Sequence, residues 1–155
     1  MNDLIAEYWF EYCKENKMEQ PVPNAWMFGD GSVDMANELG QLVAQGKKTA
    51  TCSAYILYEL EKEPLPEEGQ YDIVLDGRNK PLAIIQNTGV ELKKMKEVTS
   101  EFSRLEGEGD LSHEYWYNVH QLFFTELLAD IGKNFSDDML LVCETFKVVS
   151  KYTEH

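Results

Sequence analysis

The sequence predicts an α+β fold in which helices pack on a small antiparallel sheet or barrel. Apolar residues recur at helical spacing near the N-terminus and again late in the chain, while β-rich runs flank a hairpin turn signal and close the chain. Separate helices and antiparallel strands are typical of the α+β class. At 155 residues the chain is long enough for one domain with a real core.

Serine and glycine mark the ends of several expected helices. Ser32 and Ser112 are suited to cap helix N-termini, while Gly46 and Gly132 stand where apolar periodicity stops. A proline-containing break and an aromatic, glycine-rich loop separate the first helix from the second. The expected helices cover residues 3–17, Ser32 to Gly46, residues 54–60, a short stretch around Phe102 and Leu105, and Ser112 to about Ile131.

The expected strands lie in the middle and at the end of the chain. Residues 71–76 and 81–86 are β-rich, and the turn residues 76–79 between them, Asp-Gly-Arg-Asn, are typical of a hairpin. Residues 90–98 are expected to continue the sheet. The final run, residues 139–149, is rich in β-branched side chains and partly alternating.

Charge and cysteine content limit the classes of partner. The chain carries 28 acidic and 14 basic side chains, a net charge of −14, so no overall field attracts polyanions. We expect no DNA partner, and RNA contact requires a local basic patch. No apolar run approaches the ~20 residues of a membrane span, and the N-terminus lacks the pattern of a signal peptide. The scattered thiols of Cys13, Cys52 and Cys143 favour a reducing compartment, so we predict a cytoplasmic protein.

The most informative stretch is residues 46–51, Gly-Lys-Lys-Thr-Ala-Thr, which places two ammonium groups beside two hydroxyls. A lysine near apolar surface or another cation loses proton affinity, so Lys48, tuned by Lys47, is a candidate base or nucleophile. The hydroxyls of Thr49 and Thr51 suit a phosphate or a carbonyl oxygen. The alternative is two solvated lysines at the negative end of a helix. Lys48 and Thr51 share a face only if the segment is helical.

A second segment, residues 106–110, is acidic and rich in glycine. Glu108 lies between two glycines and is a candidate general acid or base that pairs with Lys48. Asp110 is explained equally well as a residue at the start of a helix. The hypothesis therefore depends on whether the two segments meet.

Aromatic and histidine side chains admit both functional and structural interpretations. Trp26 and Phe28 could stack a base or cover the edge of the core. His120 lies on an apolar stripe, which favours a hydrogen-bonded core histidine. The spacing of His113 and His120 matches no common zinc pattern, so we predict neither a metal nor a cofactor.

Taken together, these segments resemble the ASCH domain family of the PUA-like superfamily. Residues 46–51 look like the family signature. The similarity to the larger bacterial ASCH subfamily extends to residues 26–30, residues 36–39, residues 106–110, Trp116, His120 and Phe123-Phe124. The resemblance implies a small, partly open antiparallel β-barrel with surrounding helices and a cleft that has residues 46–51 on one wall. We expect one ASCH domain over residues 1–155, with residues 1–30 as an N-terminal helix and aromatic loop packed on it.

The resemblance also implies classes of activity. Many ASCH proteins are predicted to bind RNA, one is reported as a ribonuclease, and a smaller member deacetylates N-acetylcytidine with a Lys, a Thr and a Glu. By motif these three residues fall on Lys48, Thr51 and Glu108. The chain is thus expected to bind RNA or a modified nucleoside, with hydrolysis of an amide as a candidate activity.

Ligand-binding roles are expected for five further residues. Trp26 or Phe28 would stack the base, and Lys47, Thr49 and Asp110 would complete the ligand contacts. The alternatives are a ribonuclease or a non-catalytic RNA-binding module. In the latter, the basic cluster of residues 93–96 would extend a phosphate-binding track.

Overall fold

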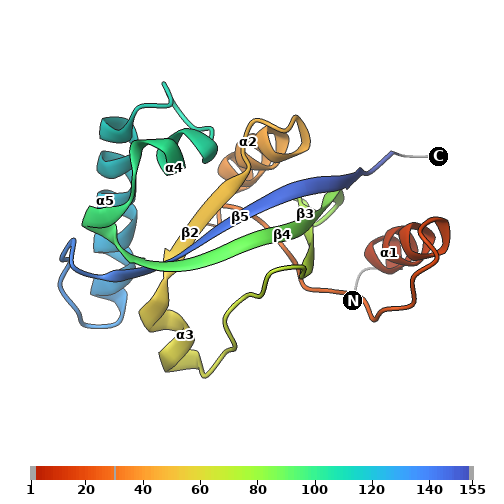
Figure 1. Cartoon of the computed structure of the whole chain (residues 1–155), viewed down its shortest axis with the longest axis horizontal. Helices are drawn as coiled ribbons and strands as arrows, with labels where there is room; N and C mark the ends of the chain where they lie inside the picture. The colour runs from red at the N-terminus through yellow and green to blue at the C-terminus, as the bar shows by residue number, and fades with distance from the viewer. Residues whose placement is uncertain (1–2, 30, 154–155) are drawn as a thin grey trace.

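A five-stranded sheet organises the chain, and helices pack on both of its faces (Figure 1). The computed structural model describes residues 3–29 and 31–153; Asp30, part of the expected aromatic loop, lies outside the described residues. The strands are β1 (Ala25–Trp26), β2 (Ala50–Ala54), β3 (Tyr71–Leu75), β4 (Pro81–Lys94) and β5 (Leu140–Lys151). The helices are α1 (Asp3–Glu15), α2 (Val33–Ala44), α3 (Tyr55–Glu61), the 3₁₀ turn Met95–Glu97, α4 (Ser100–Leu105) and α5 (His113–Asp130).

The order of strands across the sheet is β1-β3-β4-β5-β2. The short β1 runs parallel to β3, and the other neighbouring strands are antiparallel. The predicted α+β class is confirmed. The sheet is mixed and does not close into a barrel, because β1 and β2 remain as its two edges.

Side chains alternate between the two faces of the sheet along the central strands, and apolar side chains on each face form a separate part of the core. On one face, Ile73, Leu75 and Ile84 pack against α1. On the other, Val74, Ile85 and Phe146 pack with side chains of α2 and with Phe28. Since successive side chains of a strand point to opposite faces, these apolar runs cover both sides at once.

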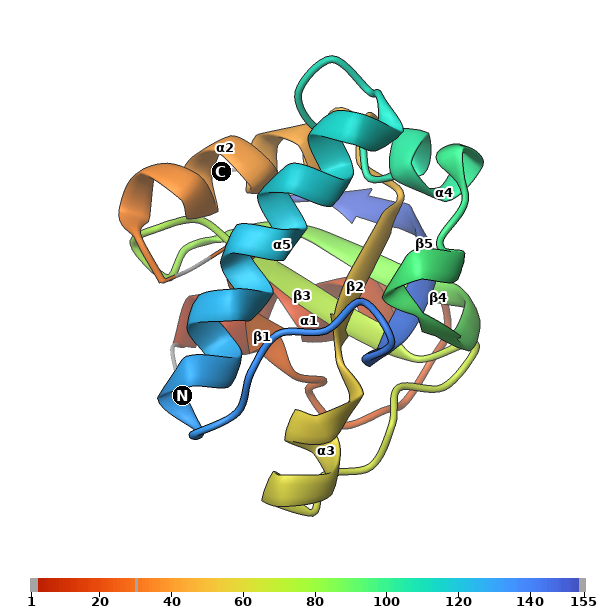
Figure 2. The same ribbon diagram turned by 90° about the vertical axis from the view of Figure 1, so that its left-hand side faces the viewer.

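The predicted helix starts are confirmed at the two serines. The Ser32 side chain accepts a hydrogen bond from the backbone N–H of Met35, and the Ser112 side chain accepts one from Tyr115. Helix α5 lies across the end of the sheet, as Figure 2 shows, and buries Trp116 and other side chains in a cluster with strand β5. This places α5 beside the segment that follows Gly46.

Residues Ala50–Ala54 form an edge strand paired with β5, which the sequence left open between helical and extended. The extended alternative is therefore correct for Thr51. Within the described part of the chain, none of the helices combines the length and hydropathy needed to cross a membrane.

Candidate functional site

Both edge strands of the sheet contribute to one cavity of about 650 Å³. Trp26 comes from β1, while Thr51 and Ser53 come from β2 at the opposite edge. Side chains of α2, α3 and α5, among them Leu39, Leu57 and Phe123, complete its walls. The sheet therefore curls so that its two edges face a common space, which is the geometry of a barrel left open.

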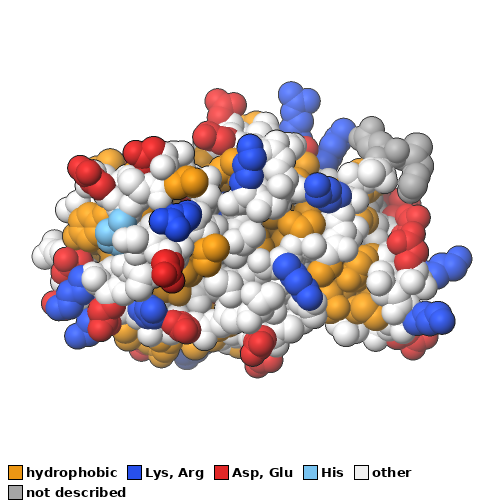
Figure 3. All heavy atoms as spheres, turned by 45° about the horizontal axis from the view of Figure 1, so that its top comes forward, with side chains coloured by type: hydrophobic (Ala, Val, Ile, Leu, Met, Phe, Trp, Pro, Cys, Tyr) orange, Lys and Arg blue, Asp and Glu red, His pale blue; other side chains and the backbone are white. Residues whose placement is uncertain are grey.

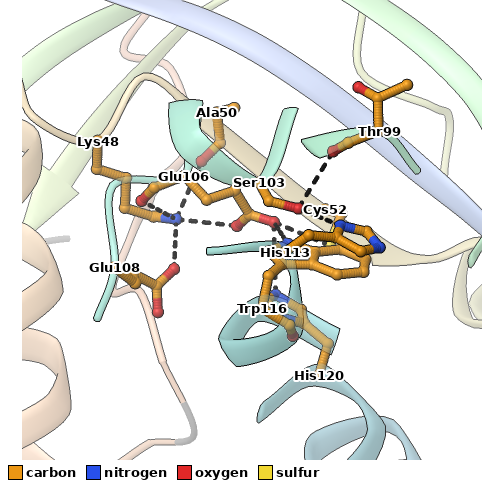
Figure 4. A network of polar contacts seen from close by, with 10 residues as sticks. All are labelled: Lys48, Ala50, Cys52, Thr99, Ser103, Glu106, Glu108, His113, Trp116 and His120. Atoms are coloured by element: carbon orange, nitrogen blue, oxygen red, sulfur yellow. Dashed lines mark hydrogen bonds and ion pairs between the residues drawn. The ribbon is translucent and has the colours of Figure 1, made fainter. Parts of the chain in front are cut away.

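Lys48 points into the protein at the wall of this cavity and is only 1% exposed. Its Nζ lies 2.9 Å from Glu108 Oε2 and 3.1 Å from Glu106 Oε1, and it also donates to the backbone carbonyl of Ala50 (Figure 4). The ring of Phe28 lies beneath the ammonium, with its centroid 5.4 Å away. The solvated-lysine alternative is therefore excluded for Lys48.

Backbone contacts bring the two predicted segments together across 58 residues of sequence. The Thr49 N–H donates to the Leu105 carbonyl at the end of α4. Gly107 adopts φ +71° directly against the Lys47 carbonyl, where a Cβ would lie 2.2 Å from that oxygen. Only glycine accommodates both the backbone conformation and this close approach.

The two carboxylates reverse the expected effect on Lys48. Burial by itself lowers the pKa of the Lys48 ammonium, but attraction to Glu106 and Glu108 outweighs burial, and the pKa is raised above its ordinary value. The prediction of a lowered pKa, tuned by Lys47, is therefore wrong. Lys47 is exposed, whereas Lys48 carries its proton at neutral pH.

Glu106 belongs to the predicted acidic segment, and it is a central residue of the site although the sequence assigned the role of partner to Glu108 instead. It is 1% exposed, its Oε1 binds Lys48, and its Oε2 accepts a hydrogen bond from the Trp116 indole. His120 Nε2 lies 3.5 Å from the same Oε2. The available signal was Trp116 on the apolar stripe of α5, because a buried indole N–H needs an acceptor.

Cys52, Glu106 and His120 bring potential ligand atoms within 4.8 Å of one another. Both oxygens of Glu106 already accept hydrogen bonds from protein donors, one of them the Lys48 ammonium, which opposes an added cation. The chemistry of this donor set therefore does not favour a metal, and the expectation of a metal-free site stays a prediction.

The other predicted ligand-binding residues divide into two groups. Trp26 and Phe28 line the cavity, with ring centroids 4.5 Å apart in an edge-to-face arrangement. The Thr49 hydroxyl donates to the Leu105 carbonyl, and Asp110 is exposed and accepts a hydrogen bond from the Ser112 N–H. Lys47, Thr49 and Asp110 are not among the described residues that line the cavity, so their ligand contacts stay predictions.

A second polar group lies on the inner face of the sheet. Glu144 lines the cavity and its Oε1 accepts a hydrogen bond from Asn87 Nδ2 at 3.1 Å. Nearby, the hydroxyls of Ser53 and Tyr58 lie 3.0 Å apart. Burial, reinforced by the charge of Asp72, raises the pKa of Glu144 to about 7. Sequence reasoning missed this residue because it lies inside a strand-forming run that looked structural.

Comparisons with known proteins agree with this fold. The model of the ASCH domain family matches residues 24–150. A crystal structure of the Enterococcus faecalis V583 protein EF3133, assigned to DUF984, shares 47% sequence identity and a TM-score of 0.92, covering 99% of this chain and 92% of that one. The ASCH domain of Lactobacillus crispatus JV V101 shares 31% identity and a TM-score of 0.90, covering 97% and 96% respectively. A comparison with curated proteins gives no match.

Proposed function

Since the chain belongs to the ASCH domain family, with its PUA-like fold, we propose that its cavity binds a small nucleoside-like molecule and hydrolyses an amide on it. The observation that carries the proposal is the buried Lys48 ammonium, fixed by Glu106 and Glu108 at the wall of a cavity of about 650 Å³. A cavity of this size, mostly apolar with a few convergent polar groups, suits a small ligand.

The charge state of Lys48 defines its role in the proposal. An ammonium that keeps its proton cannot serve as the resting base, but it can stabilise the negative charge that develops on a carbonyl oxygen under attack. Thr51 is the proposed nucleophile or positions a water molecule, and Glu108 orients Lys48. Trp26, half-buried at the cavity wall, offers a face for a heterocycle.

The charge distribution supports a small ligand over a long RNA. In the basic cluster of residues 93–96, Lys93 pairs with Glu91 at 3.3 Å and Lys96 pairs with Asp138. Figure 3 shows acidic and basic side chains interspersed on one face of the molecule. A phosphate-binding track needs lysines without such competing carboxylates. The three free thiols support the further proposal that the protein works in the reducing cytoplasm.

The direct test is incubation with N-acetylcytidine, with release of cytidine followed by chromatography. We expect the wild type to turn over, Thr51→Val to lose at least about 100-fold in kcat/KM, and Lys48→Ala to lose activity as well. Thr125→Val is the matched control, because this exposed threonine of α5 does not line the cavity, and it should retain activity.

Other results would overturn the proposal. If the wild type does not turn over, the hydrolase is wrong. If Lys48→Ala turns over as fast as the wild type, the proposed role of Lys48, which carries the proposal, is wrong. Binding of a fluorescent single-stranded RNA that weakens steeply with added salt would favour the non-catalytic RNA-binding module, or a ribonuclease if the RNA is cut.

A further inference from the structure

Glu144 lies on β5 directly opposite Thr51 of β2. In an antiparallel pair, opposite residues project from the same face with Cβ atoms about 4.5–5.5 Å apart. Both residues line the cavity. The fold therefore places a carboxyl group beside the hydroxyl that the proposed hydrolysis would use.

The surroundings of Glu144 differ from those of the other two carboxyl groups in the site. Glu106 and Glu108 are both bound to the Lys48 ammonium. Among the ion pairs of the described residues, none includes Glu144, whose Oε1 accepts from the neutral amide of Asn87. Glu144 can thus exchange a proton without breaking an ion pair.

Two titratable groups on other elements act on Glu144. Asp72 of β3 adds a like charge, and Tyr58 of α3 interacts electrostatically with both carboxyl groups. Burial is the larger influence, and together with Asp72 it raises the pKa of Glu144 to about 7. Both protonation states are therefore populated near neutral pH, which is the condition for efficient general acid–base catalysis.

Amide hydrolysis in this cavity needs such a group. A resting base must take the proton of the nucleophile, and Lys48 already carries its own proton. We propose that Glu144 is the catalytic acid–base residue of the cavity, taking the hydroxyl proton of Thr51 and returning it to the leaving amine. This inference rests on the proposed function and completes its set of roles.

The proton and electron changes balance over two steps. The Glu144 carboxylate takes the Thr51 proton while the threonine oxygen attacks the amide carbon, and the carbonyl electron pair moves to the oxygen beside Lys48. Collapse of this intermediate breaks the C–N bond, and the amine leaves with the proton from Glu144. Water then attacks the resulting ester in the same manner, releasing the carboxylic acid and restoring Thr51.

The test is the pH dependence of turnover of N-acetylcytidine by the wild type, Glu144→Gln and Glu144→Asp. We expect the wild-type rate to fall as pH drops below about 7. Glu144→Gln should lose roughly 100- to 10,000-fold in kcat, the range for a missing acid–base group, and should lose that pH limb. Glu144→Asp, which keeps a carboxyl group, should be slower but keep the limb.

The matched control is Glu59→Gln, because Glu59 of α3 is an exposed glutamate that does not line the cavity. It should leave the rate and the pH limb unchanged. Glu144→Gln with a wild-type rate and pH limb overturns the role of Glu144 while leaving the hydrolase intact. Absence of turnover by the wild type overturns the proposed function, and the role of Glu144 with it.

Discussion

A stability measurement on Glu144→Gln tests the environment of Glu144 without any substrate. The folded-state pKa of this carboxyl group is about 7, against an ordinary value of 4.5. Between these values the folded protein holds the proton and the unfolded chain releases it, so stability falls as pH rises. At 1.36 kcal/mol per pKa unit, a shift of about 2.5 units is equivalent to about 3 kcal/mol.

Glutamine does not ionise, so the variant does not lose stability as the pH rises through this range. Its side-chain oxygen can still accept the hydrogen bond from Asn87. The free energy of unfolding of Glu144→Gln, relative to wild type, should therefore rise by about 3 kcal/mol between pH 4 and pH 8. Any fixed cost of burying the amide cancels in this difference. For a domain of this size the change corresponds to a shift of about 6–12 °C in Tm.

Urea denaturation of both proteins at pH 4, 6 and 8 measures the difference. Glu126→Gln supplies the reference, since it removes an exposed carboxyl group from the same cavity wall. If the stabilities of wild type and Glu144→Gln run parallel across this pH range, Glu144 is not held in an environment that opposes its charge, and the argument built on it fails.

The remaining predictions concern the core of the site. Lys48→Met should lower the free energy of unfolding by about 3–5 kcal/mol in urea denaturation, because it leaves Glu106 buried without its cation. Lys47→Met changes an exposed residue and should lower it by less than about 0.5 kcal/mol. Equal losses of stability would contradict the pairing of Lys48 with Glu106. Gly107→Ala should lower the stability more than Gly132→Ala. Both glycines have positive φ, but only at Gly107 would the added Cβ lie 2.2 Å from a backbone oxygen. Similar melting temperatures for the two variants would contradict this clash. Cys52 and Cys143 should resist iodoacetamide at pH 8 until the protein is unfolded, because burial raises the pKa of both thiols, that of Cys143 to about 12. Rapid modification of either thiol in the native state, detected by mass spectrometry, would contradict this prediction.

Most helices and strands could be predicted from local sequence patterns. Serine caps and helix-ending glycines act through hydrogen bonds within a few residues, so Ser32 and Ser112 identified helix starts correctly. Strand β2 was harder to predict from the sequence. Ala50–Ala54 has a weak strand preference, and it is extended because it pairs with β5, about 90 residues later. The parallel pairing of the two-residue β1 likewise has no local signal.

The sequence predicted part of the candidate site, the meeting of residues 46–51 with residues 106–110, but not its electrostatics. Motif resemblance brought Lys48 and Glu108 together, and they lie 2.9 Å apart. The pKa of Lys48 moves in the opposite direction from the prediction, because the decisive neighbour, Glu106, is buried only once Trp116 and His120 of α5 close over it. Adjacent residues in the sequence, such as Lys47, are a poor guide to which charges share a buried site.

The open sheet has a thermodynamic consequence for ligand recognition. The cavity is lined from both sheet edges, β1 and β2, so the complete site exists only when the whole sheet is folded. Any molecule that bridges those edges binds the folded state alone and shifts the unfolding equilibrium of the whole domain. At 100 times its Kd such a ligand adds about 2.7 kcal/mol, which makes a rise in melting temperature a direct means of sorting nucleosides by affinity.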